Sequence, residues 1–382
     1  MESNSGNTVL DHWLAKKLND RKSDNSFRSL TLPSEKSIDF TSNDYLGLSH
    51  STELFQLIHH RLDELSMRFN GATGSRLLSG NSQQLQDVEL FLSKIFKSEC
   101  SLIFNSGYSA NLGVLSSLPQ RGDTILYDEL VHACIKDGAR LSLASRFPFG
   151  HNDLNDLESK LKKAKGNIFI AVESIYSMDG DRCPLIDLVN LAERYNAFII
   201  LDEAHSTGVM GKSGSGLAVS LGVQHKIGAR IYTFGKAMGI HGACVAGSSR
   251  LIEYLVNFSR PFIYTTALPP HSVASIECAF QYLDQHQHLQ DVLQDRVKLF
   301  LSLTSGLTNR ISSSSAIQTA IFPGNENARN ASRTLQQKGF DIRPILSPTV
   351  PADKERLRIC IHTYNTSDEI RALAESLQSI PV

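Results

Sequence analysis

Short apolar runs alternate with helical patterns through the middle of this chain, and this alternation constrains the fold more than any other feature. The runs are too short to cross a membrane and have the length of buried strands. We predict strands at 101–104, 124–127, 168–172, 198–202 and 230–233. Helices are expected at 82–97, from the turn after 104 to 118, at 129–142 and at 186–195. This alternation predicts an α/β fold with a mostly parallel sheet and helices on both faces.

The pattern changes beyond the Pro269-Pro270 break. Residues 243–247 predict a return strand, followed by helices at 250–258 and, in one long or broken pattern, at 270–305. Five more elements are expected after them, namely strands 316–322, 340–343 and 356–362 and helices 327–338 and 367–379. We therefore predict three parts: an N-terminal helix and arm (1–48), a large α/β domain (49–260) and a small α+β domain (261–382).

The composition is that of a soluble globular enzyme. The 382 residues suffice for one large and one smaller domain, and 41% are hydrophobic while 20% are charged. The formal net charge is −1, and lysine and arginine are scattered along the chain. No basic face results, so we expect neither nucleic acid nor a membrane as a partner.

The cysteines and the N-terminus predict a cytoplasmic protein without a metal site. Six cysteines lie far apart without a CxxC pair: Cys100, Cys134, Cys183, Cys244, Cys278 and Cys360. This spacing is neither a disulfide framework nor a zinc pattern, so reduced thiols are expected. The first residues, MESNSGNTVLDHW, are polar and predict no signal peptide. No apolar run approaches the roughly 18–20 residues of a membrane span.

An acid and a lysine each follow a predicted strand and suggest cofactor chemistry. Asp202 ends strand 198–202, with His205 three residues beyond it, and Lys236 follows strand 230–233 among small residues. An acid at the carboxyl end of a buried strand points into the crevice where open α/β sheets bind ligands. Pyridoxal phosphate (PLP) suits the pair, because its ring nitrogen needs an acid and its aldehyde a lysine for a Schiff base. The plainer alternatives are a turn or helix N-cap at Asp202 and a solvated loop lysine.

Two further stretches suit anions. The turn at 105–109 lies between a predicted strand and a predicted helix, so free N–H groups and the helix dipole there favour a phosphate. Near the N-terminus, a helix at 8–22 is expected to carry four apolar side chains on one face, Leu10, Trp13, Leu14 and Leu18. Basic residues that follow this face provide solubility or a clamp for an acidic acyl carrier such as coenzyme A: Arg21, Lys22 and Arg28.

Several ordered motifs carry a resemblance that covers nearly the whole chain. They are NDYLGLS, GSRLLSGN, NSGYSAN, DELVHACI, ESIYSMDGD, LDEAHSTGVMG, TFGKAMG, YTTALPP and RLRICIHTYNT. On these motifs the chain resembles the α-oxoamine synthases, PLP enzymes that share the aspartate aminotransferase fold (fold type I). The resemblance implies a large, mostly parallel sheet domain, a smaller C-terminal α+β domain and a PLP cofactor.

The resemblance also implies roles at the PLP ring. Lys236 would carry the cofactor as a Schiff base, and Asp202 would pair with the ring nitrogen. His205 would support the phenolic oxygen, and His132 would stack on the ring face. From the residues alone, His132 is equally a structural residue at a helix start, and His205 a helix cap.

Other implied roles concern the phosphate, the substrate and a second subunit. Gly107 and Tyr108 would lie near the phosphate with Thr233, which is otherwise a plain strand residue, while the site would be lined by Glu173 and Ser177. Asn43 and Arg358 would hold the amino-acid carboxylate, although Arg356 lies on the same strand face. A homodimer with shared sites is implied through residues expected to reach the neighbouring subunit's phosphate, Thr265 and Thr266.

The chain departs from the family pattern at three positions. Leu85 lies where a histidine is frequent, Ser215 where an arginine is common, and Ala243 where a second glycine is often found. None of these positions takes part in the Schiff-base chemistry. They affect the expected packing of loops and the binding of the acyl carrier.

The resemblance implies the decarboxylative condensation of L-alanine with a pimeloyl thioester, on coenzyme A or acyl carrier protein, to give 8-amino-7-oxononanoate. Alternatives within the family pair glycine with acetyl-CoA, serine with a palmitoyl thioester, or glycine with succinyl-CoA. Two alternatives from other classes are a simple aminotransferase and a catalytically silent scaffold. The joint presence of Lys236, Asp202 and Arg358 argues against a scaffold, which needs none of them.

Overall fold

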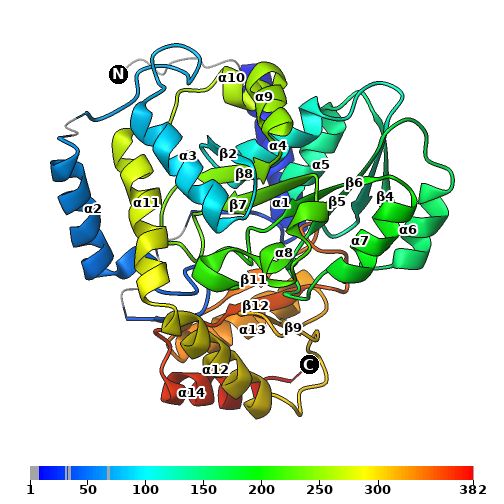
Figure 1. Ribbon diagram of the computed structural model, residues 1–382. Helices are drawn as coiled ribbons and strands as arrows, with labels where there is room; N and C mark the ends of the chain where they lie inside the picture. The colour runs from blue at the N-terminus through cyan, green and yellow to red at the C-terminus, as the bar shows by residue number, and fades with distance from the viewer. Residues whose placement is uncertain (1–7, 31, 33–35, 67–68, 382) are drawn as a thin grey trace.

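The computed structural model describes residues 8–30, 32, 36–66 and 69–381. A seven-stranded sheet forms the centre of the molecule, and a three-stranded and a two-stranded sheet accompany it. In Figure 1 the three-stranded sheet lies below the large one, beside the yellow to red helices of the C-terminal part. The predicted α/β fold with a large, mostly parallel sheet is confirmed.

The large sheet contains one antiparallel strand. In spatial order its strands are β2 (Cys100–Phe104), β8 (Ala243–Gly247), β7 (Ala229–Thr233), β6 (Phe198–Asp202), β5 (Ile168–Glu173), β3 (Thr124–Asp128) and β4 (Ser145–Phe149). β8 runs antiparallel to both of its neighbours, as a return strand must, and the other pairs are parallel. The carboxyl ends of β3, β5, β6 and β7 therefore lie along one edge of the sheet.

Strand β4 was not expected from the sequence. Its five residues, SRFPF, are not a continuous apolar run, and four of them are exposed. β4 is an edge strand with Pro148 in its middle, and an edge is where a sheet tolerates proline. An exposed edge needs no apolar signature, so the pattern did not reveal it.

The sheet separates two apolar cores because successive strand residues point to opposite faces. On β8, Ala243 and Val245 belong to one core, whereas Cys244 and Ala246 belong to the other. One core contains helices α4, α5 and α7, and the other contains α3 and α11 and continues into the small C-terminal sheet. Nearly continuous burial on both faces is typical of a parallel sheet sandwiched between helices.

Helices of the central part lie between or beside the strands: α3 (Gln83–Ile95), α4 (Gly107–Ser117), α5 (Ala133–Leu141), α6 (Leu154–Leu161), α7 (Leu185–Arg194), α8 (Leu217–Ser220), α9 (Ser249–Phe258) and α10 (Arg260–Ile263). The helix expected at 129–142 begins only at Ala133, because residues 129–131 form a turn and His132 is the N-cap. α6 was not expected, and Asp153 caps its start by accepting from two backbone N–H groups.

The C-terminal part follows the predicted order of elements. Its antiparallel sheet has the order β11 (Arg343–Ile345), β12 (Arg356–Cys360), β9 (Ile317–Ile321). The long helical pattern is broken at residues 286–287, and the helices of this part are α11 (Pro270–Gln285), α12 (His288–Leu303), α13 (Asn325–Gln337) and α14 (Ser367–Gln378). The strand expected at 340–343 divides into β11 and a short β10 (Phe340–Asp341), which pairs with β1 (Ile38–Asp39). The division into these three parts remains a prediction.

The N-terminal helix α1 (Thr8–Ser23) exists, but none of its described side chains is buried. Leu10, Trp13, Leu14 and Leu18 are all exposed. The next helix, α2 (Thr52–Glu64), was not predicted; it packs against α11. Within the described parts of the chain, every helix is too short or too polar to cross a bilayer.

Phe96 offers a test of the core on the α3 side of the sheet. Its ring is fully buried, stacks on Tyr232 at 3.6 Å and meets Phe280 edge-on. Phe96→Ala should lower the free energy of unfolding by about 3–5 kcal/mol, because a large cavity remains. Chemical denaturation measures this loss, and Phe55→Ala, at a side chain that is 60% exposed, is the control and should change little. Equal effects would contradict the packing described.

Candidate functional site

The carboxyl edge of the large sheet brings the predicted acids together. Glu173 ends β5 and Asp202 ends β6, and the two residues are register partners in adjacent parallel strands. Both side chains are buried. Thr233 ends the next strand, β7, and the turn that follows carries Lys236. Parallel pairing therefore places residues from three separate segments along one crevice, as the strand-end pattern predicted.

A chain of hydrogen bonds connects Lys236 to the N-terminal segment. Lys236 Nζ lies 2.7 Å from His205 Nε2, and His205 Nδ1 lies 2.8 Å from the hydroxyl oxygen of Tyr45. Tyr45 donates to Asn43 Oδ1 at 3.0 Å. The turn of Lys236 also touches this segment, since a Cβ at Gly239 would collide with the backbone of Ser49.

Burial determines which groups in this chain of hydrogen bonds are protonated. Burial lowers the pKa of Lys236, against the opposing attraction of Asp202 and Glu173. It also lowers the pKa of His205 well below the ordinary value, and the neighbouring Lys236 adds to this effect. A neutral imidazole beside an amine with a lowered pKa favours the free base form that proton transfer and nucleophilic attack require.

Asp202 is fixed in place by two donors. Asn111 Nδ2 donates to its Oδ2 at 2.7 Å, and the backbone N–H of Ala204 donates to its Oδ1 at 2.8 Å. The second contact is a turn of the kind expected for an aspartate after a strand. Asn111 itself is held within α4, where it also donates to the carbonyl of Gly107. Asp202 therefore has one orientation, with its carboxylate close to the start of α4.

The start of α4 is built for an anion. Ser106 is the N-cap and accepts from the backbone N–H of Ser109. The N–H groups of Gly107 and Tyr108 precede this capped one, and such groups at a helix start attract negative charge. Gly107 has no room for a side chain, because a Cβ there would collide with the Thr233 hydroxyl. The Tyr108 hydroxyl donates to Asp137 on α5, which ties this half-exposed ring to that helix.

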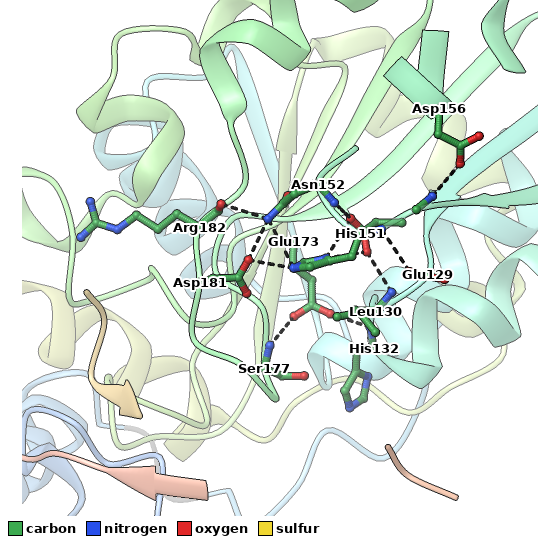
Figure 2. A network of polar contacts seen from close by, with 12 residues as sticks. Glu129, Leu130, His132, His151, Asn152, Asp156, Glu173, Ser177, Asp181 and Arg182 are labelled. Atoms are coloured by element: carbon green, nitrogen blue, oxygen red, sulfur yellow. Dashed lines mark hydrogen bonds and ion pairs between the residues drawn. The ribbon is translucent and has the colours of Figure 1, made fainter. Parts of the chain in front are cut away.

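Glu173 joins two loops of the site. Its carboxylate accepts from the backbone N–H of His132 and, at 3.1 Å, from that of Ser177. Figure 2 shows this carboxylate between the two loops, while the His132 ring points away from the polar network. Burial and the nearby Asp202 raise the pKa of Glu173, and burial and Lys236 lower that of His132.

The small sheet contributes an arginine. Arg358 on β12 donates from Nε to the carbonyl of Ser177 at 2.7 Å and from a terminal nitrogen to Asn43 Oδ1 at 2.9 Å. Arg356, the alternative on the same strand face, instead forms an ion pair with Asp179 and donates to the carbonyl of Lys354. Arg358 therefore contacts Asn43, whereas Arg356 is bound to Asp179 instead.

Three residues that the sequence analysis placed in the site lie apart from the hydrogen-bonded residues described above. Arg21 is in the last turn of α1, whose described side chains are all exposed. Thr265 and Thr266 follow α10 and lie against Asn105 of the same chain, which donates to the Thr265 hydroxyl at 3.3 Å and the Thr266 carbonyl at 2.9 Å. These threonines are therefore beside the turn that precedes α4.

The residues that depart from the family pattern are all packed. Leu85 is buried in α3, Ala243 in β8, and Ser215 in the loop before α8. Leu85 and Ala243 are small or apolar side chains in apolar cores and fit their places without a polar partner. The Ser215 hydroxyl is buried and has no hydrogen-bond partner among the described residues.

Three site residues escaped the sequence analysis: Tyr45, Asn105 and Asn111. Each belongs to a motif already singled out, NDYLGLS or NSGYSAN, which was the available signal. Their roles depend on partners far away in sequence; Tyr45 and His205 are 160 residues apart. Periodicity and strand ends cannot indicate such side-chain contacts.

Comparison with known proteins identifies the family. Residues 35–377 match the model of the family described as aminotransferase class I and II. The 8-amino-7-oxononanoate synthase of Emericella nidulans is 38% identical over 375 residues, which cover 92% of this chain and 90% of that protein. A putative 8-amino-7-oxononanoate synthase of Bacillus licheniformis is 36% identical and covers 97% of both chains.

The chain belongs to the aminotransferase class I and II family, in its α-oxoamine synthase branch. Solved structures agree. Serine palmitoyltransferase from S. paucimobilis, in a structure with a PLP–myriocin aldimine, has a TM-score of 0.86 at 25% identity, covering 98% of this chain and 97% of that one. The 8-amino-7-oxononanoate synthase from Francisella tularensis has a TM-score of 0.78 at 29% identity and covers 90% of this chain and 97% of that one.

The residues present fit PLP. A buried, doubly anchored carboxylate at Asp202 suits a protonated ring nitrogen, and the buried amine of Lys236 suits an aldehyde. The helix start at Gly107, closed to any side chain by Thr233, is a cradle for a phosphate. All three features lie at the carboxyl edge of the large sheet.

Gly107 provides a test of the phosphate cradle. Gly107→Ala should weaken PLP binding at least about tenfold, because the new methyl group must displace Thr233 or the helix start. Titration of the apoprotein with PLP, followed by absorbance, measures the change. Gly306→Ala is the matched control, since a Cβ there meets no atom within 4 Å. If the Gly107 variant bound PLP as tightly as this control, the cradle would lie elsewhere.

Proposed function

We propose that the chain condenses L-alanine with a pimeloyl thioester, on coenzyme A or acyl carrier protein, with loss of carbon dioxide, to give 8-amino-7-oxononanoate. One observation carries the proposal: Lys236, His205, Tyr45, Asn43 and Arg358 form a continuous chain of contacts. An amine for the cofactor and a guanidinium for a carboxylate therefore lie at opposite ends of one site. The relatives named as 8-amino-7-oxononanoate synthases support this substrate pair.

Residues at the sheet edge would hold the cofactor. We assign Lys236 to its aldehyde carbon, Asp202 to its ring nitrogen, and Gly107, Tyr108 and Thr233 to its phosphate. His205 would face the phenolic oxygen, with His132 over the ring and Glu173 and Ser177 lining the site. When bound, PLP supplies an electron sink for the pair of electrons left at a substrate carbon.

Lys236 is the proposed general base. Its free amine would remove the Cα proton of alanine. The lowered pKa of Lys236 favours the unprotonated amine that this step requires. Neutral His205, 2.7 Å from Nζ, keeps the amine oriented without adding a positive charge.

Arg358 is the proposed anchor for the alanine carboxylate. Its contacts with Ser177, Asn43 and the Cys360 sulfur fix the plane of the guanidinium. The terminal nitrogen that contacts Cys360 has a second N–H that no described residue uses, whereas the other contacts both Asn43 and, at 3.4 Å, the Tyr45 hydroxyl. A guanidinium N–H of this kind suits a carboxylate, because the hydrogen bond is charge-assisted. Asn43 Oδ1 is already occupied by Arg358 and Tyr45, so Asn43 would donate to the substrate from Nδ2.

His132 is the proposed donor to the oxyanion that forms on the thioester carbonyl. Its Nδ1 accepts from the backbone N–H of Cys134 at 3.2 Å. A neutral ring with this contact carries its proton on Nε2, and the lowered pKa of His132 favours the neutral ring. A donor aimed at a developing negative charge stabilises the transition state more than the ground state.

The bond changes balance with these groups, the bound cofactor and one proton from water, because the leaving thiolate and Cα each take up a proton while Cα gives up only one. The Cα proton passes to Lys236, and the electron pair left at Cα forms a bond to the thioester carbon. The carbon–sulfur bond breaks and releases a thiol. The carboxylate of alanine then leaves as carbon dioxide, and a proton returns to Cα to complete the product.

The proposal extends to a homodimer that shares its active sites, located in the cytoplasm. The exposed apolar side chains of α1 provide a surface for a second subunit, and Thr265 and Thr266 would reach that subunit's phosphate site. Arg21 would contact the acyl carrier. The described cysteines are all free thiols, five of them buried, which suits a reducing compartment.

A second candidate is another α-oxoamine synthase, and the serine palmitoyltransferase structures favour it most, because they cover 98% of this chain. Such an enzyme would keep Lys236, Asp202 and Arg358 in the same roles. It would differ in the amino acid and in the acyl chain. Substrate preference distinguishes these two candidates.

Substitution of Lys236 tests the base. Lys236→Ala should lower turnover by at least about 10³-fold and remove the visible band of the lysine-bound cofactor, because no other amine takes its place. Assays with alanine and pimeloyl-CoA measure turnover. Lys212→Ala, at a loop lysine outside the site, is the control. Substantial turnover by the Lys236 variant would contradict the proposal.

The identity of the amino-acid substrate is tested by titrating the PLP-loaded protein with L-alanine, glycine and L-serine in separate experiments and following the absorbance. We expect the largest spectral change at the lowest concentration with alanine, and a further change when pimeloyl-CoA is added. A preference for serine with a palmitoyl thioester would favour the second candidate instead. A protein that shows no visible band after PLP is added would contradict the cofactor assignment.

A further inference from the structure

His151 lies just beyond the site, in the turn after β4, and both of its ring nitrogens face carboxylates. Nδ1 is 3.0 and 3.1 Å from the two oxygens of Asp128, and Nε2 is 2.8 Å from Asp181 Oδ2. The side chain is 21% exposed, and the ring meets Tyr176 edge-on. Figure 2 shows His151 and Asp181 within the polar network behind His132.

This geometry requires the charged form of His151. A neutral imidazole has one N–H and one lone pair, so one of the two carboxylates would face a lone pair. An imidazolium donates from both nitrogens. Its hydrogen bonds to Asp128 and Asp181 outweigh the effect of burial and raise the pKa of His151 to about 9.

The other groups near His151 leave this charge balance intact. Glu129 accepts from the backbone N–H of His151, and Tyr176 contributes a neutral ring. Asp179 also has an oxygen within 4.8 Å of the His151 and Asp181 ligand atoms, but it forms an ion pair with Arg356. The protein's own cations, His151 and Arg356, therefore offset two of the three aspartate charges in this cluster.

The two carboxylates that His151 joins belong to the two loops of the site. Asp128 accepts from the backbone N–H of Leu130 at 2.8 Å, which shapes the turn leading to His132. The carbonyl of Asp181 accepts from the backbone N–H of Tyr176, next to Ser177. Glu173 connects the same two loops from the inside, through the N–H groups of His132 and Ser177. His151 thus forms a second, outer connection between them.

We propose that His151, as an imidazolium between Asp128 and Asp181, is a positioning residue that holds the His132 turn and the Ser177 loop at their working separation. It touches neither substrate nor cofactor. Its effect on catalysis passes through His132, the proposed donor to the thioester oxyanion, and through Ser177, whose carbonyl accepts from Arg358. The kinetic part of this inference rests on the proposed function; the charge and the loop connection do not.

The charge of His151 is tested directly by NMR of the PLP-loaded protein with ¹⁵N-labelled histidine. His151→Gln identifies the signal by its disappearance. We expect both ring nitrogens to show shifts of an imidazolium at pH 7.5 and to titrate near pH 9. A ring that is neutral at pH 7.5 would overturn the proposal, whatever reaction the enzyme catalyses.

The loop connection is tested by hydrogen exchange and by melting temperature. His151→Gln should speed exchange in residues 128–132 and 174–182, and His60→Gln, at an exposed histidine paired with Glu64, should not. Because the pKa of His151 is raised on folding, its stabilisation is complete below about pH 6.5 and is lost as pH rises through about 9. The difference in Tm between wild type and His151→Gln should therefore shrink at alkaline pH. Unchanged exchange in both loops would overturn the connection.

Kinetics tests the positioning role. His151→Gln should lower kcat about tenfold or more at neutral pH with a smaller change in KM, since misplaced groups affect the transition state most. Wild-type kcat should fall above about pH 9 towards the value of the variant, whose own profile lacks that step. A variant with wild-type kcat and the same pH profile as His60→Gln would overturn the role. If wild type itself does not condense alanine with pimeloyl-CoA, the proposed function fails, while NMR and hydrogen exchange still decide the charge of His151 and the connection between the loops.

Discussion

The buried amine of Lys236 beside two strand-end carboxylates is the interaction on which the rest of the site depends. Burial alone would drive the amine to its neutral form, and Asp202 and Glu173 oppose that tendency. Two adjacent acids at one sheet edge also repel each other, and burial with that repulsion raises the pKa of Glu173. Backbone N–H groups and Asn111 satisfy their oxygens, so the arrangement persists without a metal or an exposed surface.

The site is formed where the two larger sheets approach each other. The large sheet supplies the acids and the lysine turn, and β12 of the small sheet supplies Arg358. The segment with Asn43 and Tyr45 joins them: Tyr45 contacts His205 on one side, and its carbonyl accepts from the backbone N–H of Thr363, just after β12, on the other. Movement of the small sheet would therefore change the position of the substrate's carboxylate relative to Lys236.

The sequence was sufficient for the main sheet and for the acid and lysine, because both follow continuous apolar strands whose ends fix their place. It did not reveal β4, an exposed edge strand without an apolar run, nor α2 and α6, which are short amphipathic helices with two buried apolar residues each. Arg356 and Arg358 were equivalent on their strand, and only the ion pair of Arg356 with Asp179 separates them. Tyr45, Asn111 and His151 act through partners remote in sequence, so spacing carried no sign of their contacts.

The most direct test of the central claim follows the carboxylate of alanine. The PLP-loaded enzyme is given pimeloyl-CoA and L-alanine labelled with ¹³C at the carboxyl carbon, and the label is traced by NMR and mass spectrometry. The account predicts that the label leaves as carbon dioxide, one for each thiol released, and that the amino ketone product is unlabelled. Label retained in pyruvate, without release of thiol, would show an aminotransferase and contradict the condensation.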